Sequence, residues 1–297
     1  FMRELPIPTF DLSPDQRKHR ALPLRRRTQA AVAPFLTVIS SPTTDAPLPQ
    51  SGAESSPVLQ IQWARHLDEV REAQRLRYAV FAQEMGATLQ GDIAGHDIDR
   101  FDDYCEHLLV REQTSGLVVG TYRLLTPAQA QRAGGLYSET EFDLSALAHL
   151  RSNMVELGRS CVHPEHRNGG VIMALWGALA DFLSSNGLDT MIGCASIPMQ
   201  HQGLPSGYAA ASIWEQVRHK YMAAPQYHVS PHLPLPVQAL QNDAVVEPPA
   251  LIKGYLRLGT KVLGAPAWDP QFNSADLPMM MRIADLPARY RQRFMGA

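Results

Sequence analysis

The stretch ELGRSCVHPEHRNGG (residues 156–170) joins a strand-like apolar segment to the helical run VIMALWGALADFL (residues 171–183) through a loop with two adjacent glycines. Backbone N–H groups at the start of a helix have no partner within the helix, and the helix dipole adds positive potential there. Gly169 and Gly170 let the backbone approach an anion closely, and Arg167 supplies a positive charge. The loop lacks the Lys-Ser/Thr ending of the nucleotide P-loop and the G-x-G-x-x-G spacing of dinucleotide sites. It therefore predicts another kind of phosphate site, and a glycine-rich helix start without a ligand is the alternative.

The periodicity of apolar residues around this loop predicts an α/β fold. Alternation over residues 58–64 predicts a strand, and apolar spacings of three and four over residues 67–85 predict a helix. Residues 107–125 contain two strand-like segments around a Thr-Ser-Gly turn. Further strands are predicted at residues 153–162, 189–196 and 275–283, and further helices at residues 171–187, 210–221 and 249–259. This order of elements predicts a single α/β domain with a mixed sheet.

The first 57 residues differ in composition from the rest of the chain. They contain nine of the 23 prolines and the polar tract SSPTTDAPLPQSGAESSP (residues 40–57). Such a tract buries too little apolar surface to offset the entropy lost on ordering. We therefore predict a flexible leader over residues 1–57 and a folded domain over residues 58–297. Residues 25–40 have the outline of a secretory signal, three arginines before an apolar stretch, but Pro34 interrupts that stretch.

The composition argues against several classes of function. A net charge of −2 over 297 residues disfavours a dedicated nucleic-acid binder, and no run of apolar residues is long enough to span a membrane. The three cysteines lie far apart in apolar segments, which predicts a reducing cytoplasm and no metal site. A covalent acyl-cysteine at Cys161 or Cys194 is an alternative chemistry, although free cysteine in a strand-like context is usually an inert core residue.

A pattern V-x-P-x-x-R-x-x-G begins at Val162, at the end of a predicted strand. It resembles the pyrophosphate loop of GCN5-related N-acyltransferases, which implies their fold: a mixed, mostly antiparallel central sheet flanked by helices. The resemblance also implies binding of coenzyme A or of a 4′-phosphopantetheine arm. The binding residues so implied are Val162, His163, Arg167, Asn168, Gly169 and Gly170. Ile172 stands where coenzyme A enzymes favour a small residue, so the expected donor is a thioester of the phosphopantetheine arm of acyl carrier protein.

Charged residues before the loop form a second pattern. They are Arg77 with Phe81 four residues later, Asp99 with Asp102, Arg123, and Glu156 with Arg159. Their spacing and order resemble the charged cluster of acyl-homoserine lactone synthases, although Gly158 replaces a serine and no tryptophan closely follows the phenylalanine. Longer segments resemble bacterial ornithine-lipid N-acyltransferases over about residues 58–290. Among them are RYAVFAQEMGA (residues 77–87), DIDRFDDYCEHLLV (residues 97–110) and APAWDPQFNSADLPMM (residues 265–280).

The resemblance to ornithine-lipid enzymes implies transfer of a 3-hydroxyacyl chain from acyl carrier protein to the α-amine of ornithine, giving lyso-ornithine lipid. It implies no permanently bound cofactor. The expected partners are acyl carrier protein, an amino-acid substrate and, peripherally, the inner face of the membrane around a cytoplasmic protein. No nucleic-acid partner is expected. The alternatives are N-acylation of another amino acid, acyl-homoserine lactone synthesis, or a non-catalytic regulator that binds acyl carrier protein or membrane.

Amide formation from a thioester requires a neutral amine, a held carbonyl and a route for the proton. We predict that Glu156 accepts this proton, directly or through water. We predict that Arg159, Asp99 and Asp102 set the charge and geometry of Glu156. These four residues are the predicted catalytic set. Three further residues are predicted to complete the network or to position the substrate: Arg77, Phe81 and Arg123. A purely structural ion-pair network is the alternative.

Overall fold

Residues 58–89 and 91–295 are described by the structure, a computed structural model of the chain, and the predicted leader over residues 1–57 lies outside them. The strands are β1 (Leu59–Trp63), β2 (Glu106–Glu112), β3 (Val118–Leu125), β4 (Phe142–Asp143), β5 (Met154–Val162), β6 (Thr190–Pro198), β7 (Ser230–Pro231), β8 (Lys261–Val262), β9 (Ala267–Asp269) and β10 (Ser274–Arg282). The α-helices are α1 (Leu67–Tyr78), α2 (Pro127–Ala133), α3 (Gly170–Ser185), α4 (Tyr208–Lys220), α5 (Ala250–Arg257) and α6 (Ala288–Met295). Short π or 3-10 segments are η1 (Ala79–Glu84), η2 (Asp102–Tyr104), η3 (Tyr137–Thr140), η4 (Ser145–Leu150), η5 (Pro164–His166), η6 (Pro225–Tyr227) and η7 (Ile283–Asp285).

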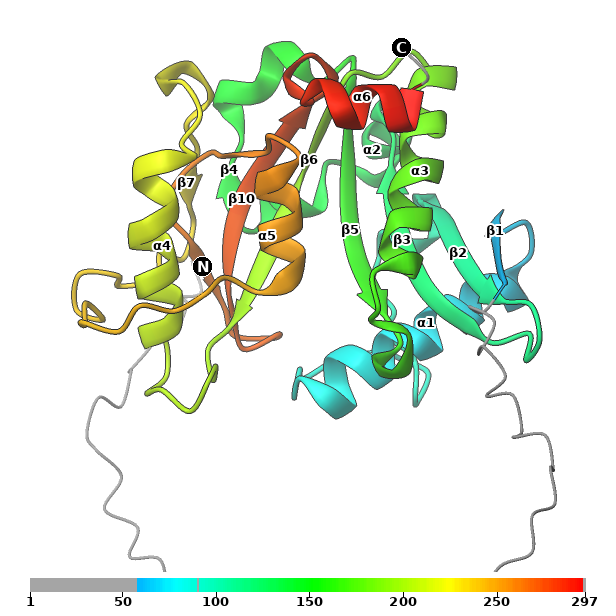
Figure 1. Ribbon diagram of the computed structural model, residues 1–297, viewed down its shortest axis with the longest axis horizontal. Helices are drawn as coiled ribbons and strands as arrows, with labels where there is room; N and C mark the ends of the chain where they lie inside the picture. The colour runs from blue at the N-terminus through cyan, green and yellow to red at the C-terminus, as the bar shows by residue number, and fades with distance from the viewer. Residues whose placement is uncertain (1–57, 90, 296–297) are drawn as a thin grey trace, which may run out of the picture. The chain divides into compact units, whose positions relative to one another are not determined.

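Within the described residues, eight strands form one sheet in the order β1-β2-β3-β5-β6-β10-β8, and β9 pairs with β10 (Figure 1). The neighbours pair antiparallel except β5 and β6, which run parallel. β4 and β7 form a separate two-stranded pair. The predicted mixed, mostly antiparallel sheet is therefore confirmed.

The two faces of the sheet bury different helices, because successive side chains of a strand point to opposite faces. On β2, Leu108 and Val110 join the core formed with α3, whereas Leu109 between them packs in the core formed with α1. All three side chains are fully buried. β2 is thus covered on both faces, which explains its continuous apolar run.

The first helix ends differently from the prediction. The periodicity predicted a helix to residue 85, but α1 is α-helical only to Tyr78 and then widens into the π-helical η1. A π turn closes its hydrogen bonds one residue later than an α turn, so the side chains that follow are rotated about the helix axis. Phe81 and Glu84 of η1 consequently lie in the wall of the large cavity described below.

Among the described residues, no helix combines the length and the apolar character needed to cross a bilayer.

Candidate active site

A cavity of about 670 Å³ lies where β5 and β6 separate. These parallel strands pair over residues 154–156 and 190–192 and then diverge toward their C-terminal ends (Figure 1). Gly193 lies at the fork, where an added Cβ would approach the carbonyl oxygen of Leu157 to 2.3 Å. A glycine is therefore required where the two strands begin to part.

The β5 strand bulges where it borders the cavity. Arg159 and Ser160 together stand opposite Tyr122 of β3, and Arg159 has a left-handed φ of 52°. A bulge interrupts the ladder and leaves its extra residue unpaired. Because Gly158, Arg159 and Ser160 all line the cavity, this stretch of backbone borders the space available to a substrate.

Glu156 lies in the cavity wall with only 4 % of its surface exposed. Its two carboxylate oxygens accept the backbone N–H groups of Tyr137, at 2.7 Å, and of Ser138, at 2.6 Å, at the start of η3. Burial raises the pKa of Glu156 above its usual value, and these hydrogen bonds oppose the rise. The carboxylate is thus held rigidly and is more basic than an exposed glutamate.

Three arginines and three aspartates form a closed ring of ion pairs beside the cavity, here named the arginine–aspartate ring. Its members are Arg77, Asp97, Arg159, Asp99, Arg123 and Asp102 in order round the ring. Each arginine bridges two aspartates, and the nitrogen–oxygen distances of the salt bridges run from 2.6 to 3.2 Å. The structure thus brings together Arg77, Asp99, Asp102, Arg123 and Arg159, as the sequence predicted.

The charges of the ring compensate one another. Burial alone would raise the pKa of Asp102, but Arg77 and Arg123 hold it far below its usual value. Burial likewise opposes the charged form of Asp99, and Arg123 with Arg159 outweighs that effect, so its pKa is lowered. Asp99 and Asp102 therefore stay ionised at every physiological pH. The polar contacts that orient Glu156 come from η3 instead of from this ring, which corrects the prediction that Arg159, Asp99 and Asp102 set its geometry.

The glycine loop occupies the other end of the cavity. Val162, Arg167 and Gly169 line it, and Gly169 is the left-handed N-cap of α3 with φ of 92°. The amide of Gly170 donates to the side chain of Asn168. His163 is not among the residues that line the cavity, and its ring packs edge-on against that of His166, which does line it. The structure thus brings three of the predicted loop residues to the cavity and leaves their role in binding as a prediction.

Arg167 has a protein partner at this end of the cavity. Its guanidinium forms two hydrogen bonds with the carboxylate of Glu84 in η1, at 2.6 and 2.7 Å, and a third with the carbonyl of Val162. Both charged side chains are about 40 % exposed. An anion that uses Arg167 must therefore share it with Glu84.

Cys161 and Cys194 are poor candidates for a nucleophile. Burial raises the pKa of the Cys161 thiol to about 12 and that of Cys194 well above its usual value. Since the thiolate is the nucleophilic form, both thiols are unreactive near neutral pH.

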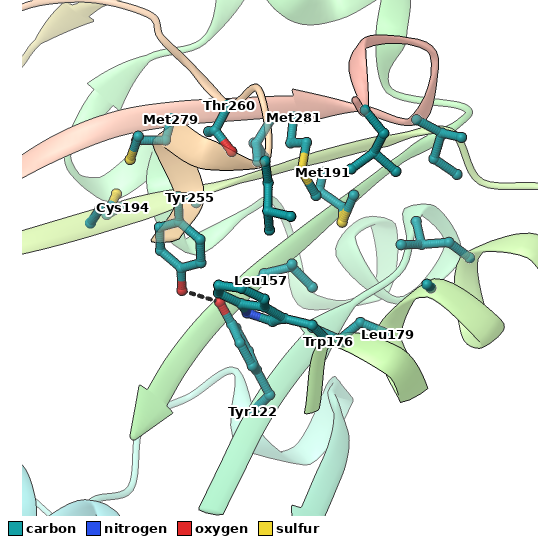
Figure 2. A pocket seen from close by; sticks show the side chains of 18 residues that line it. Tyr122, Leu157, Trp176, Leu179, Met191, Cys194, Tyr255, Thr260, Met279 and Met281 are labelled. Carbon is teal, nitrogen blue, oxygen red and sulfur yellow. Dashed lines mark hydrogen bonds between the residues drawn. The ribbon is translucent and has the colours of Figure 1, made fainter. Parts of the chain in front are cut away.

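A second cavity of about 90 Å³ adjoins the first (Figure 2). Both cavities share six lining residues: Tyr122, Leu157, Trp176, Cys194, Ala195 and Tyr255. The rest of the wall of the smaller cavity is almost entirely aliphatic and includes Leu179, Met191, Met279 and Met281. The hydroxyl groups of Tyr122 and Tyr255 hydrogen-bond to each other at its edge (Figure 2). This space suits an apolar chain.

Several residues in or beside the cavity wall were not predicted from the sequence. Asp97 completes the arginine–aspartate ring, and its proximity in sequence to Asp99 was an available signal. Ser138 holds Glu156 from a distant segment, and no local pattern indicates that contact. Asp269 and Asp276, here named the cavity carboxylates, also line the cavity while only 4 % and 3 % exposed. A buried acid within the apolar strand β10 was the signal for Asp276.

Comparison with known proteins agrees with this geometry. Residues 76–177 match the model of the Acetyltransferase (GNAT) domain family. The L-ornithine N(alpha)-acyltransferase of Brucella abortus is 34 % identical over 256 residues, which cover 78 % of this chain and 87 % of the relative. The enzyme of the same name from Agrobacterium fabrum is 34 % identical and covers 80 % and 85 %. The chain belongs to the L-ornithine N(alpha)-acyltransferase family.

Membership confirms the predicted GCN5-related fold and makes the protein an N-acyltransferase. Among solved structures, the CoA-dependent acyl-homoserine lactone synthase BjaI with SAM and isopentyl-CoA matches with a TM-score of 0.48 and 17 % identity, covering 80 % of this chain and 89 % of that one. In the part of the chain that the structure describes, no group of three or more His, Cys, Asp or Glu side chains is placed to hold a metal ion.

Proposed function

We propose that this N-acyltransferase moves an acyl chain from the 4′-phosphopantetheine thioester of acyl carrier protein to the α-amine of ornithine, giving lyso-ornithine lipid. The names of the relatives support ornithine as the acceptor. The observation that carries the proposal is the single cavity that joins the glycine loop at Gly169 to the carboxylate of Glu156. A donor arm held by its phosphate at the loop would place its thioester along β5, next to a buried base.

The donor end of the cavity suits a phosphate. The first backbone N–H groups of α3 lack partners within the helix, and the dipole of this 16-residue helix favours an anion at its start. Arg167 adds a positive charge that Glu84 shares. We expect the phosphodiester of the arm to compete with Glu84 for Arg167, because it accepts bidentate hydrogen bonds from a guanidinium and would also lie at the N-terminus of α3.

The acyl chain would continue into the second cavity. Its aliphatic wall between α3, α5 and β10 offers burial at roughly 0.8 kcal/mol for each methylene group. The hydroxyl groups of Tyr122 and Tyr255 hydrogen-bond to each other in its wall (Figure 2), and both residues also line the larger cavity. They could therefore hydrogen-bond a 3-hydroxyl group on the acyl chain.

The chemical step needs no further protein nucleophile. The neutral α-amine attacks the thioester carbon and forms the carbon–nitrogen bond, while Glu156 takes one proton from the nitrogen. Collapse of the tetrahedral intermediate breaks the carbon–sulfur bond, and the departing thiolate takes up the proton from Glu156. Burial supports this role because it raises the pKa of Glu156. The backbone at the β5 bulge, Gly158–Ser160, borders the cavity and could donate to the carbonyl oxygen.

The substitution Glu156→Gln tests the mechanism. It keeps the shape of the side chain and an acceptor oxygen for one of the two backbone amides. We expect turnover to fall by about 10²–10⁴, with the KM for the donor nearly unchanged, because the glycine loop is intact. The deficit should shrink as pH rises and more of the amine arrives neutral. Full activity at pH 7 would remove Glu156 from the mechanism, and a loss that does not depend on pH would indicate a structural role.

The reaction itself is tested with purified protein, acyl carrier protein charged with a 3-hydroxyacyl chain, and each amino acid in turn. Mass spectrometry should detect the N-acylated product with ornithine. A product with another amino acid alone would correct the acceptor, and a lactone product from S-adenosylmethionine would indicate homoserine lactone synthesis. Binding of the carrier without turnover would indicate a regulator.

A further inference from the structure

We propose that the cavity carboxylates, Asp269 and Asp276, bind the side-chain ammonium of the acceptor and so select a diamino acid. This inference rests on the proposed function, because it assigns the part of the cavity that recognises the ornithine side chain. It predicts that the enzyme discriminates between acceptors by a positive charge at the end of a short alkyl arm.

The two carboxylates are fixed side by side on one face of the sheet. β9 and β10 pair antiparallel, with Asp269 opposite Ser274, two residues before Asp276. Residues two apart on a strand share a face. The hydroxyl of Ser274 donates to Asp276 at 2.9 Å, and the amides of Gln271 and Phe272 donate to one oxygen of Asp269. The contacts orient both carboxylates in the cavity wall.

Neither cavity carboxylate has a cationic partner among residues 58–89 and 91–295. No lysine, arginine or histidine there lies within salt-bridge distance of Asp269 or Asp276. The cation that acts on Asp276 is Arg159, whose guanidinium already pairs with Asp97 and Asp99. A buried carboxylate with neutral donors only is costly unless a cation joins it. This uncompensated negative charge, open to a cavity, is the independent observation that points to a cationic ligand.

The raised pKa values of two acids at this end of the cavity support the same assignment of an ammonium site. Burial and then the charge of Asp269 raise the pKa of Asp276 to about 6. Burial and then both cavity carboxylates raise the pKa of Glu141 to about 8. Three acidic groups thus repel one another at this end of the cavity. A bound ammonium would relieve that repulsion, whereas a phosphate or an acyl chain would not.

The position fits an acceptor whose α-amine lies near Glu156. Ser138 donates its backbone N–H to Glu156, and its hydroxyl lies 3.6 Å from the sulfur of Cys194. Burial and then Asp276 raise the pKa of the Cys194 thiol, and Glu156 contributes as well. Cys194 is therefore close to both the proposed base and the proposed ammonium site, since it contacts Ser138 and lies two residues before Ser196, the partner of Asp276 on β6. The propyl arm of ornithine would cross the gap between these two sites over Cys194.

The test compares ornithine with norvaline, which has the same carbon chain and lacks the side-chain ammonium. With the full chain and acyl carrier protein as donor, we expect kcat/KM for ornithine to exceed that for norvaline by about 100-fold or more. Asp276→Asn and Asp269→Asn should each lower kcat/KM for ornithine by about 10–100-fold. Neither substitution should lower kcat/KM for norvaline or change the KM for the donor. The ratio of the two acceptors is a readout that a merely structural role would not move.

Glu112→Gln is the matched control. It removes one carboxylate charge at the end of β2, outside the residues that line either cavity, and should leave the ornithine-to-norvaline ratio unchanged. Equal use of ornithine and norvaline by the unaltered enzyme would overturn the assignment while leaving N-acylation of ornithine in place. An unchanged ratio in both Asn variants would overturn it as well. Absence of transfer to any amino acid would instead remove the proposed function, and this inference with it.

Discussion

Two groups of carboxylates lie in or beside the wall of one cavity and differ in their counter-ions: Asp269 and Asp276 line it, whereas the arginine–aspartate ring reaches it through Arg123 and Arg159. In the arginine–aspartate ring, every aspartate meets two guanidinium groups. Asp269 and Asp276 are buried as deeply as Asp97 and Asp102 of the ring, but their hydrogen-bond donors are backbone amides and a serine hydroxyl. The pKa of Asp102 consequently lies far below its usual value, where burial is outweighed by Arg77 and Arg123, and that of Asp276 is raised to about 6.

The difference separates a structural role from a binding role. A ring whose charges cancel holds its own shape and gains little from a further ion. A pair of carboxylates without a counter-ion lowers the stability of the empty protein and gains from a cationic ligand. Such a local loss of stability is common where a protein is built to bind. Burial of charge alone therefore does not identify a site in this cavity, whereas the absence of compensation does.

Removal of a charge from the ring should have the largest effect on folding. Asp102→Asn leaves Arg77 and Arg123 each with one carboxylate fewer in a dry environment. We expect the free energy of unfolding to fall by about 3–5 kcal/mol, measured by urea denaturation. A change below about 1 kcal/mol would show that the ring does not stabilise the fold and would break the comparison.

The same substitution at a cavity carboxylate should act in the opposite direction. The pKa of Asp276 is about 6 in the folded chain against 3.8 as the usual value, raised by burial and then by Asp269. Asp276 thus holds its proton more tightly in the folded chain than in the unfolded chain, so the contribution of this one group to stability is fully present below about pH 4 and is lost as pH rises through about 6. At pH 8 the carboxylate of Asp276 is ionised at a cost to the folded state. Asp276→Asn removes this charge and should raise the free energy of unfolding by about 1–3 kcal/mol at that pH.

Near pH 4 the Asn variant and the unaltered protein should be nearly equal in stability, which provides an internal control for the substitution. The charged groups that face Asp276 are Asp269, Glu141 and Arg159, and Glu141 should also titrate at a lower pH in the variant. Destabilisation by Asp276→Asn at pH 8 would mean that the carboxylate is compensated after all, and the contrast with the ring would be lost.

The smallest effect is expected at the exposed pair of Glu84 and Arg167. Both side chains are about 40 % exposed, so solvent screens their attraction. Glu84→Gln should change the free energy of unfolding by less than about 1 kcal/mol. It should also lower the KM for the donor, because it frees Arg167 for the phosphate. A higher KM for the donor would indicate that Glu84 itself contributes to the glycine-loop site.

The sequence predicted the parts of the fold that have a strong local period. The strands β2 and β3 and the helix α3 were read from apolar spacing and lie where predicted. The short helix α2 was missed although its start carries a clear signal, since Thr126 and Gln129 form a capping box around Pro127. The π segment η1 was missed because its residues have the same apolar spacing as an ordinary helix.

The sequence also predicted five of the six members of the arginine–aspartate ring, because their order and spacing resemble those of related enzymes. It did not predict how they are joined, nor that Glu156 is held by the backbone of Tyr137 and Ser138. Backbone donors carry no side-chain identity, so no residue type marks them in advance.

The amino-acid sequence by itself thus determined the α/β class, the glycine loop before α3 and the membership in an acyltransferase family, since each depends on residues close together in the chain. The tertiary structure decided which buried acids are compensated. Asp276 lies opposite Ser196 and near Cys194 only because β10 pairs with β6. It borders a cavity only because β5 and β6 separate after Glu156. The charge balance of a buried group is a sum over neighbours from distant segments, and the order of residues along the chain does not reveal that sum.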